Sequence, residues 1–401
     1  MVQNLRILFV VQRYGPDVPG GAELLCRELA TRLAGLGHEV HAATTCARSY
    51  ADWADEYAAG TSTIDGVAVH RFPVARPRDP AQFADVSSRV TLGTEPMALE
   101  LQEEWMRLQG PWTPGLVEWL DEHCEEFDVA VFVTYLYWTS WAGLRALAGR
   151  IPALLVPTAH DEPTLRLPMF NLLFALPDAM AFLTEEEMAL VGERFPGAPP
   201  GAVLGAGVDL GAADAPERVR EFRDRFGLDD RPYLVVVGRF DPAKGSTELV
   251  EYFAAYRDRN PQRDLALVVV GEPMYDLGEH PDLIVTGFVD EATRRAAVAG
   301  AVIAVQPSYF ESFSLVLAEA WVAGKPALVQ RECAVTNGQA HRSGAGIPYR
   351  GYAEFEAAVD LLLDSPDLAA TLGRRGRRFV ETSYEWETVL PRYERVLRAL
   401  V

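Results

Sequence analysis

The feature of this sequence that most limits its possible folds is a series of short apolar runs that recurs along the whole chain. The runs lie at residues 6–11, 39–45, 67–72, 129–134, 153–158, 179–184, 233–238, 265–271, 283–288, 302–307 and 326–330. Helical patterns lie between them, as in residues 22–37, where leucines recur at every fourth position. Continuous apolar strands that alternate with helices are typical of parallel sheets covered on both faces. We therefore predict an α/β protein built from doubly wound, Rossmann-like sheets.

The length of the chain indicates two domains. Its 401 residues are many for one hydrophobic core and suit two domains of about 200 residues each. We place the linker in the Gly- and Ala-rich segment 201–216, because apolar strands resume after it. The predicted domains are residues 1–207 and 208–381, and a helix over 382–401 is expected to pack back on the first domain. Ligands of doubly wound sheets bind beyond the carboxyl ends of the strands, so the cleft between the domains is the expected site.

The charge balance excludes some classes of partner. A net charge of −20 argues against nucleic acid or an anionic membrane held by overall charge. One basic cluster contains Arg374, Arg375, Arg377 and Arg378. We interpret this cluster as a solvated helix face, with at most a weak peripheral membrane contact.

Cysteine usage and the apolar stretches indicate the compartment. Cys26, Cys46, Cys124 and Cys333 are scattered and form no C-x-x-C pair, so neither a disulfide framework nor a zinc site is expected. The amino terminus runs straight into an apolar strand and lacks the layout of a signal peptide. The longest apolar stretch, near residues 168–183, is too short and too interrupted to span a bilayer. We expect a cytoplasmic protein.

Two carboxylates stand eight positions apart in the segment SYFESFSLVLAEAWVAGKP. Glu311 precedes a predicted helix, and Glu319 lies inside it. Free backbone N–H groups at Ser314 and Leu315 would point at an anion, and the helix dipole would add to the attraction. Glu319, about one turn in, could accept hydrogen bonds from ribose hydroxyls, and Glu311 would face a sugar. Each glutamate alone could be a solvated acid, but the pair with its flanking residues favours a ligand site.

The segment GRFDPAKG places two basic side chains, Arg239 and Lys244, directly after a strongly apolar strand. A guanidinium can clamp phosphate oxygens in a bidentate fashion, and an ammonium supplies a second, mobile charge. Together they could stabilise the negative charge that builds on a departing diphosphate. The alternative is a strand-to-helix loop on the surface that happens to be basic.

The acids and bases together have the chemistry that a nucleotide diphosphate-sugar requires. No strand is followed by the G-x-G-x-x-G spacing of a dinucleotide dehydrogenase. The chain also contains no D-x-D dyad. We therefore expect the basic side chains to replace a divalent metal, and we expect no cofactor.

With these motifs in place, the sequence resembles the retaining glycosyltransferases of family 4, which have the GT-B fold. The resemblance rests on E-x7-E after a strand, with G-R-x4-K-G upstream, and it extends over nearly the whole chain. Gly20 and Gly21 resemble the family's PGGAE loop, which approaches the donor phosphate and the acceptor. The turn over residues 207–209 resembles the family's G-V-D turn at the end of the first domain. Many members have glycine where Ser314 stands, and residues 333–346 have no assignment.

The resemblance implies roles for individual residues. Arg239 and Lys244 would bind the diphosphate, Glu319 the ribose and Glu311 the donor sugar. His160, followed by Asp161, matches the family's histidine near the transferred sugar. We expect further residues to bind the donor, in the glycine-rich loops of the chain and in the loop that starts the helix after Glu311. They are Gly20, Gly21, Gly271, Gly287, Phe288, Val289, Phe313, Ser314 and Leu315. Residues 287–289 would border the nucleotide base.

The predicted reaction moves a sugar from a nucleotide diphosphate donor to a hydroxyl, with the anomeric configuration retained. By family analogy, the acceptor attacks on the face that the diphosphate leaves, and a diphosphate oxygen takes the proton. A covalent route with Asp161 or Glu311 as nucleophile is the less favoured alternative. Two other functions stay open: another GT-B enzyme, such as a phosphorylase or an epimerase, and a non-catalytic nucleotide- or sugar-binding protein. The sequence leaves the donor sugar, base and acceptor undetermined.

Overall fold

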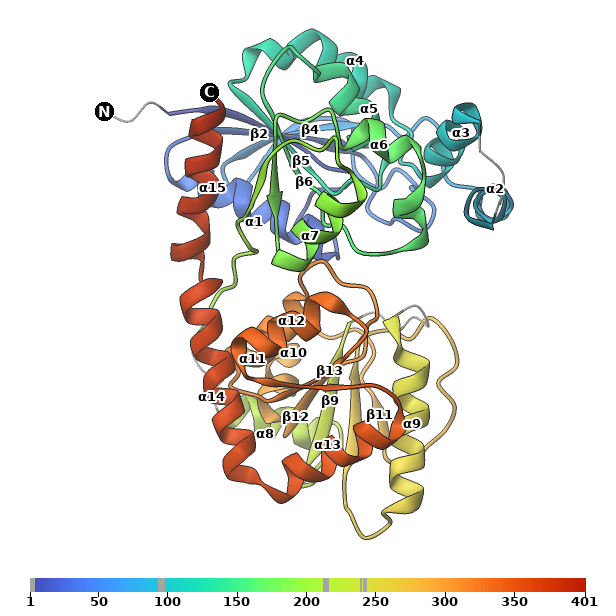
Figure 1. Cartoon of the computed structure of the whole chain (residues 1–401), viewed down its shortest axis with the longest axis vertical. Helices are drawn as coiled ribbons and strands as arrows, with labels where there is room; N and C mark the ends of the chain where they lie inside the picture. The colour runs from blue at the N-terminus through green and yellow to red at the C-terminus, as the bar shows by residue number, and fades with distance from the viewer. Residues whose placement is uncertain (1–3, 93–97, 212–215, 239, 241–243) are drawn as a thin grey trace. The chain divides into compact units, whose positions relative to one another are not determined.

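The chain forms two compact units. The computed structural model describes residues 4–92, 98–211, 216–238, 240 and 244–401. Unit 1 consists of residues 1–207 and 387–401, and unit 2 consists of residues 208–386. Figure 1 shows that each unit has a central sheet with helices around it.

Unit 1 contains an eight-stranded sheet. Its strands are β1 Arg6–Val10, β2 Glu39–Thr45, β3 Gly60–Ile64, β4 Val67–Phe72, β5 Val129–Val133, β6 Ala153–Val156, β7 Ala179–Phe182 and β8 Gly201–Val203. The spatial order is β3-β4-β2-β1-β5-β6-β7-β8. Among the strands of the described residues in this sheet, only β3 runs antiparallel to its neighbour, β4. Strand order therefore reverses direction between β1 and β5, and both of these strands are buried.

Helices and short turns connect these strands. They are α1 Gly21–Gly35, α2 Pro80–Leu92, α3 Leu99–Gln109, α4 Pro114–His123, α5 Trp138–Leu147, α6 Met169–Leu173 and α7 Glu185–Arg194, with 3-10 turns at Cys124–Glu126 and Pro163–Arg166. The last helix, α15 Trp386–Leu400, also packs on this unit. The Tyr393 hydroxyl donates to the Gly205 carbonyl oxygen at 3.0 Å, and Glu394 lies 3.5 Å from His38. These contacts attach the end of the chain to the first strands and the last loop of unit 1.

Unit 2 contains a six-stranded, fully parallel sheet. Its strands are β9 Tyr233–Val237, β10 Ala266–Val270, β11 Leu283–Val285, β12 Ile303–Gln306, β13 Ala327–Gln330 and β14 Gly346–Tyr349. Their order is β11-β10-β9-β12-β13-β14. This is the doubly wound order of a Rossmann fold, and it reverses between β9 and β12. That reversal marks where such sheets bind ligands.

The helices of unit 2 cover both faces of its sheet. They are α8 Pro216–Arg225, α9 Ser246–Arg259, α10 Glu291–Gly300, α11 Leu315–Val322, α12 Ala334–Ser343, α13 Tyr352–Asp364 and α14 Pro366–Ser383. Along β9, Leu234 and Val236 enter one hydrophobic cluster, whereas Tyr233 and Val235 enter another. Successive side chains of a strand point to opposite faces, so both faces must be apolar. This is why the strands of this unit read as continuous apolar runs.

The predicted α/β class with two parallel, doubly wound sheets is confirmed. The described structure adds three strands that the apolar pattern did not predict, β3, β8 and β14. All three lie at an edge of their sheets. An edge strand such as β3, which is almost wholly exposed, needs no apolar run. No helix in the described residues has the length and apolar character that crossing a membrane requires.

Candidate active site

Lys244 and Glu311 meet where the strand order of the unit 2 sheet reverses. Lys244 follows β9, Glu311 follows β12, and these strands are neighbours. Gly245, which precedes α9, has a left-handed backbone with φ of 69°, and a Cβ there would lie 2.2 Å from the carbonyl oxygen of Pro307. Glycine at this position therefore lets the loop after β9 touch the loop after β12.

The ammonium of Lys244 is held by the loop that carries Glu311. It donates to Glu311 Oε1 at 2.9 Å and to the Phe310 carbonyl oxygen at 3.0 Å. The two side chains are 36% and 16% exposed, so the ion pair is partly open to solvent. A diphosphate can compete for this ammonium, and a sugar hydroxyl can donate to this carboxylate. Arg239, the other predicted base, lies outside the described residues.

Helix α11 begins with an unusual backbone at Ser314, whose φ and ψ are 71° and 77°. The Ser314 hydroxyl accepts a hydrogen bond of 2.6 Å from Gln306 Nε2. Phe313 is buried, and its ring packs edge-on against Tyr384 at 4.7 Å. Among the described residues, no side chain caps this end of the helix. The first N–H groups of the helix, beginning at Leu315, therefore keep the chemistry of an anion site.

Glu319 is paired with an arginine that the sequence analysis did not single out. Both of its carboxylate oxygens accept hydrogen bonds from Arg294 of α10, one of them at 3.0 Å. Burial opposes the charge of Arg294, but the hydrogen bonds and charges of Glu319 and Glu291 outweigh it and raise its pKa above the ordinary value. Such a bidentate pair fixes the orientation of the carboxylate. A ribose hydroxyl would have to share Glu319 with this guanidinium.

Glycines bring three strand ends of unit 2 close together. A Cβ at Gly271 would lie 2.1 Å from the Gly238 carbonyl oxygen, and Gly271 also forms an antiparallel bridge with Gly287. The next residue, Phe288, is 85% exposed, whereas Val289 packs partly against the core. An aromatic ring left this open beside the strand ends is suited to cover a planar group.

In unit 1, the predicted glycine loop is shaped by a buried ion pair. Glu23 accepts hydrogen bonds from Gln12 at 2.8 Å and from Arg13 at 2.9 Å. Arg13 also donates to the Pro19 carbonyl oxygen at 3.0 Å, and both charged side chains are almost fully buried. A Cβ at Gly20, whose φ is 144°, would lie 2.1 Å from Glu23 Oε2. Gly20 is therefore required by the carboxylate that folds over it, and Gly21 begins α1.

His160 and Asp161 follow β6 on a loop of unit 1. His160 is half-buried, with Nδ1 3.9 Å from Glu162 Oε1. Asp161 is exposed and pairs with Arg166 at 3.2 Å. The Tyr135 hydroxyl donates to Glu162 at 2.6 Å, which ties the loop to the end of β5. The two predicted residues therefore lie on the same loop, where His160 faces Glu162 and Asp161 pairs with the exposed Arg166.

The loop that carries His160 is also anchored to the deeply buried Glu187 of α7. The N–H groups of Ala159 and Leu183 both donate to its carboxylate at 2.6 Å. Burial raises the pKa of Glu187 to about 8, against the effect of these backbone hydrogen bonds. One buried carboxyl therefore joins the ends of β6 and β7.

Comparison with known proteins identifies the family of this chain. Residues 219–379 match the family "Glycosyl transferases group 1". The chain is 30% identical to D-inositol 3-phosphate glycosyltransferase 2 of Catenulispora acidiphila, over 90% of this chain and 85% of that protein. This chain is a group 1 glycosyltransferase. It is also 28% identical to a glycogen synthase of Mycobacterium tuberculosis, over 96% of this chain and 92% of that protein.

Solved structures show the same fold. Sucrose-phosphate synthase of Thermosynechococcus elongatus superposes with a TM-score of 0.72 at 18% identity, over 98% of each chain. Anabaena HepE, in complex with UDP and glucose, gives a TM-score of 0.72 at 16% identity, over 99% of this chain and all of HepE. The fold of this glycosyltransferase is therefore GT-B. Family membership favours sugar transfer from a nucleotide-sugar donor over the epimerase, phosphorylase and binding-protein alternatives.

Position 314, where the resemblance implies glycine in many family members, has a backbone that suits glycine. The left-handed backbone with φ of 71° is easy for glycine and unfavourable for residues with a Cβ. In this glycosyltransferase, serine adopts it and gains the hydrogen bond from Gln306. The helix-start geometry is thus kept with a different side chain.

Several residues of the site region were absent from the sequence-based predictions, among them Gln306, Glu23, Arg294, Glu187 and Gln339. Each of three such residues forms a hydrogen bond to a residue or loop that a motif had singled out: Arg294 to Glu319, Glu187 to the loop of His160, and Gln339 to Phe313. Glu187 had a weak local signal, since it stands three residues after the capping Thr184. Arg294 and Gln339 belong to no motif. They are found only from their contacts in the structure: Arg294 of α10 contacts Glu319 of α11, and Gln339 of α12 contacts Phe313 in the loop before α11.

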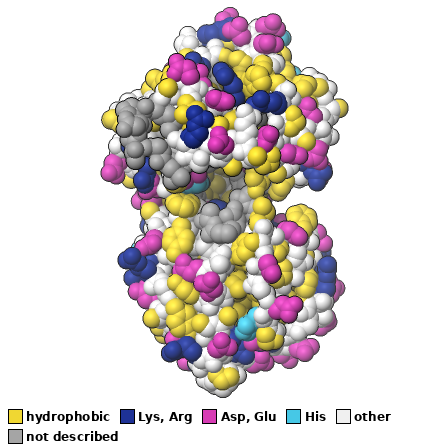
Figure 2. All heavy atoms as spheres, turned by 90° about the vertical axis from the view of Figure 1, so that its right-hand side faces the viewer, with side chains coloured by type: hydrophobic (Ala, Val, Ile, Leu, Met, Phe, Trp, Pro, Cys, Tyr) yellow, Lys and Arg dark blue, Asp and Glu magenta, His cyan; other side chains and the backbone are white. Residues whose placement is uncertain are grey.

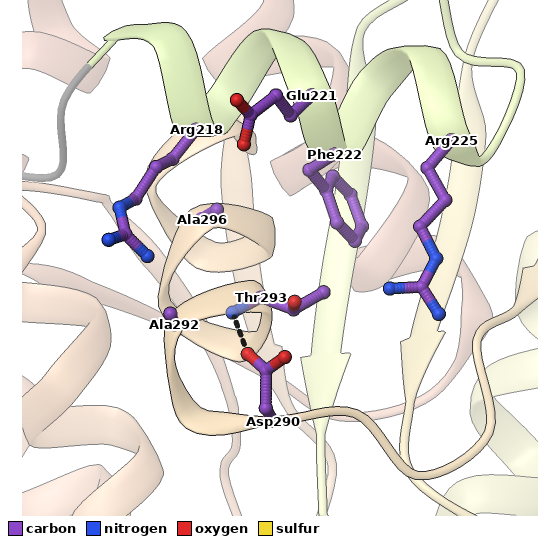
Figure 3. A pocket seen from close by; sticks show the side chains of 8 residues that line it. All are labelled: Arg218, Glu221, Phe222, Arg225, Asp290, Ala292, Thr293 and Ala296. Atoms are coloured by element: carbon purple, nitrogen blue, oxygen red, sulfur yellow. Dashed lines mark hydrogen bonds between the residues drawn. The ribbon is translucent and has the colours of Figure 1, made fainter.

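A separate hollow of about 290 Å³ lies between α8 and α10 of unit 2 (Figure 3). It is lined by Arg218, Glu221, Phe222, Arg225, Asp290, Ala292, Thr293 and Ala296. None of these is a predicted site residue. Asp290 caps α10 by accepting from the Thr293 N–H at 2.8 Å, and this hydrogen bond lowers the pKa of Asp290. The cap fixes the start of the helix that carries Arg294.

The surface of each unit carries mixed charge. On the face in view, Figure 2 shows Lys and Arg side chains interspersed with Asp and Glu side chains over each unit. Within the described residues, no three His, Cys, Asp or Glu side chains are grouped so that they could hold a metal ion.

Proposed function

We propose that this glycosyltransferase binds the nucleotide diphosphate of its donor in unit 2 and transfers the sugar with retention of configuration, without a metal ion. The observation that carries the proposal is the meeting of Lys244, Glu311 and the start of α11 at the reversal of strand order. An ammonium and the free N–H groups of a helix end suit a diphosphate, and a carboxylate beside them suits sugar hydroxyls.

In the proposed reaction, the bond between the anomeric carbon and the diphosphate oxygen breaks, and a bond to the acceptor oxygen forms on the same face. The acceptor proton passes to an oxygen of the leaving diphosphate. Lys244, with Arg239 as the second base, would stabilise the charge that develops there. Glu319 would bind the ribose, and Gly271, Gly287, Phe288 and Val289 would border the base.

Glu311 is assigned to the donor sugar and not to a covalent intermediate. Its carboxylate lies 2.9 Å from the Lys244 ammonium, which places it beside the proposed diphosphate site. His160 and Asp161 remain the candidates that unit 1 contributes to the reaction. Product analysis by proton NMR tests retention, because the anomeric coupling constant distinguishes the two configurations.

The first experiment is a thermal-shift panel of UDP, GDP, ADP, TDP and CDP, with and without magnesium. UDP comes first because HepE was solved with UDP-glucose and trehalose-6-phosphate synthase with UDP-2-fluoro glucose. Saturation at 100 times Kd should add about 2.7 kcal/mol of stability. A shift from one diphosphate without magnesium supports the proposal, whereas a shift that requires magnesium contradicts metal independence.

Lys244→Ala should lower kcat about a hundredfold without unfolding the protein. The matched control is Lys325→Ala, which removes a lysine near the amino end of β13, away from the loops described above. Near-wild-type turnover in Lys244→Ala would refute the assignment of the diphosphate site. An equal loss in both lysine variants would instead indicate a general effect on unit 2.

A further inference from the structure

Residues 333–346, which the motifs left unassigned, pack against the loop that precedes α11. They contain α12 and begin at Cys333, whose buried thiol lies near Glu311. Gln339 of α12 is fully buried and donates from Nε2 to the Phe313 carbonyl oxygen at 2.6 Å. This segment therefore contacts the loop from behind, at two places.

The contact with Phe313 determines where the next N–H points. A peptide group is planar and trans, so its C=O and N–H point in opposite directions. Gln339 holds the Phe313 carbonyl toward α12. The N–H of Ser314, in the same peptide group, is consequently turned away from α12. Gln306 holds the same turn from β12, through the 2.6 Å hydrogen bond to the Ser314 hydroxyl.

Neither the backbone of Ser314 nor the burial of Gln339 is favourable by itself. A residue with a Cβ is disfavoured at φ of 71°. Gln339 Oε1 is buried, and it has no hydrogen-bond partner within the described part of the chain. A buried polar atom without a partner destabilises the folded state. An apolar side chain at this position would avoid that penalty, so the amide is best explained by its effect on the loop.

We propose that Gln339 and Gln306 are positioning residues, which hold Ser314 in its left-handed conformation so that the N–H groups of Ser314 and Leu315 are preset to receive the donor diphosphate. The inference rests on the proposed donor site in unit 2. It assigns residues 333–346 to the support of that site. Neither glutamine is required to touch the donor.

The test compares Gln339→Met with the wild type in the affinity for the nucleoside diphosphate that gives the largest shift in the five-member panel. Methionine keeps the volume and removes the donor, together with the unpartnered oxygen. We expect diphosphate binding about tenfold weaker, with a melting temperature close to that of the wild type. Unchanged affinity in Gln339→Met would overturn the proposal.

A second substitution separates positioning from general structure. Glycine adopts the left-handed conformation without help, so Ser314→Gly should reduce the need for Gln339. The double variant Ser314→Gly/Gln339→Met should bind the diphosphate about fivefold more tightly than Gln339→Met alone. Equal affinities of these two variants would contradict the positioning role.

Two further variants keep the test decisive if Gln339→Met fails to fold. Gln306→Leu should weaken diphosphate binding several-fold, and Ser314→Ala should bind more weakly than Ser314→Gly. The opposite order at position 314 would overturn the inference.

Gln102→Met is the matched control, because Gln102 is a buried glutamine that holds a backbone N–H in unit 1. It should leave diphosphate affinity unchanged. If the wild type binds no diphosphate, the proposed donor site itself fails.

Discussion

Replacing Glu187 with glutamine should change how the stability of unit 1 depends on pH. The Glu187 side chain is fully buried, and burial raises its pKa from 4.5 to about 8. Glutamine has nearly the same shape and does not titrate. The difference in stability between wild type and variant therefore isolates the ionisation of this one carboxyl.

The sign follows from proton binding in the folded and unfolded states. Below pH 4.5, the carboxyl is protonated in both states, and its contribution to stability is fully present. Between pH 4.5 and about 8, the folded state keeps a proton that the unfolded state has released, so stability falls as pH rises. The slope is about 1.4 kcal/mol per pH unit, or about 2.7 kcal/mol between pH 5 and pH 7. Above pH 8 the curve is flat again.

The assay is thermal or urea unfolding of wild type and Glu187→Gln at pH 5, 6 and 7. Tryptophan fluorescence reports mainly on unit 1, because most of the eight tryptophans are there: Trp53, Trp105, Trp112, Trp119, Trp138 and Trp141. Relative to the variant, the wild type should lose about 5–10 °C of Tm from pH 5 to pH 7. Glu185→Gln, at an exposed position of the same helix, is the matched control and should show no such change.

If the stabilities of the wild type and of Glu187→Gln change equally between pH 5 and pH 7, the reasoning is refuted. A wild type that gains stability relative to Glu187→Gln as pH rises would refute it more strongly. That outcome would mean that the N–H groups of Ala159 and Leu183 outweigh burial and keep the carboxylate ionised.

Two further predictions concern the loops of the site. Gly20→Ala should destabilise unit 1 by about 2 kcal/mol or more, because the added Cβ meets the buried Glu23 carboxylate. Gly35→Ala, at the other end of α1 where a Cβ meets nothing within 4 Å, should be neutral or stabilising in the same urea titration. Arg294→Met should raise the donor KM several-fold with a smaller effect on kcat, because Glu319 loses the guanidinium that orients it. An unchanged donor KM would show that Glu319 needs no such partner.

The sequence alone determined the fold class and the main strands of both units. The predicted runs 39–45 and 67–72 coincide with β2 and β4. This works because a strand buried on both faces must be apolar along its whole length, which leaves a pattern in a single sequence. The edge strand β3 lacks such burial and was missed for that reason.

The sequence also singled out Glu311 and Glu319 as candidate acids, because their spacing fits one helix and the loop before it. Only the tertiary structure decided what those acids contact. Lys244 reaches Glu311 from 67 positions away, and Arg294 reaches Glu319 from 25.

The left-handed backbone of Ser314 and its support by Gln339 likewise depend on packing between distant segments. The spacing of residue types along the sequence reflects what a single helix or strand requires of its own residues. Contacts between elements depend on how the sheet orders its strands, and that order leaves no local mark in the sequence.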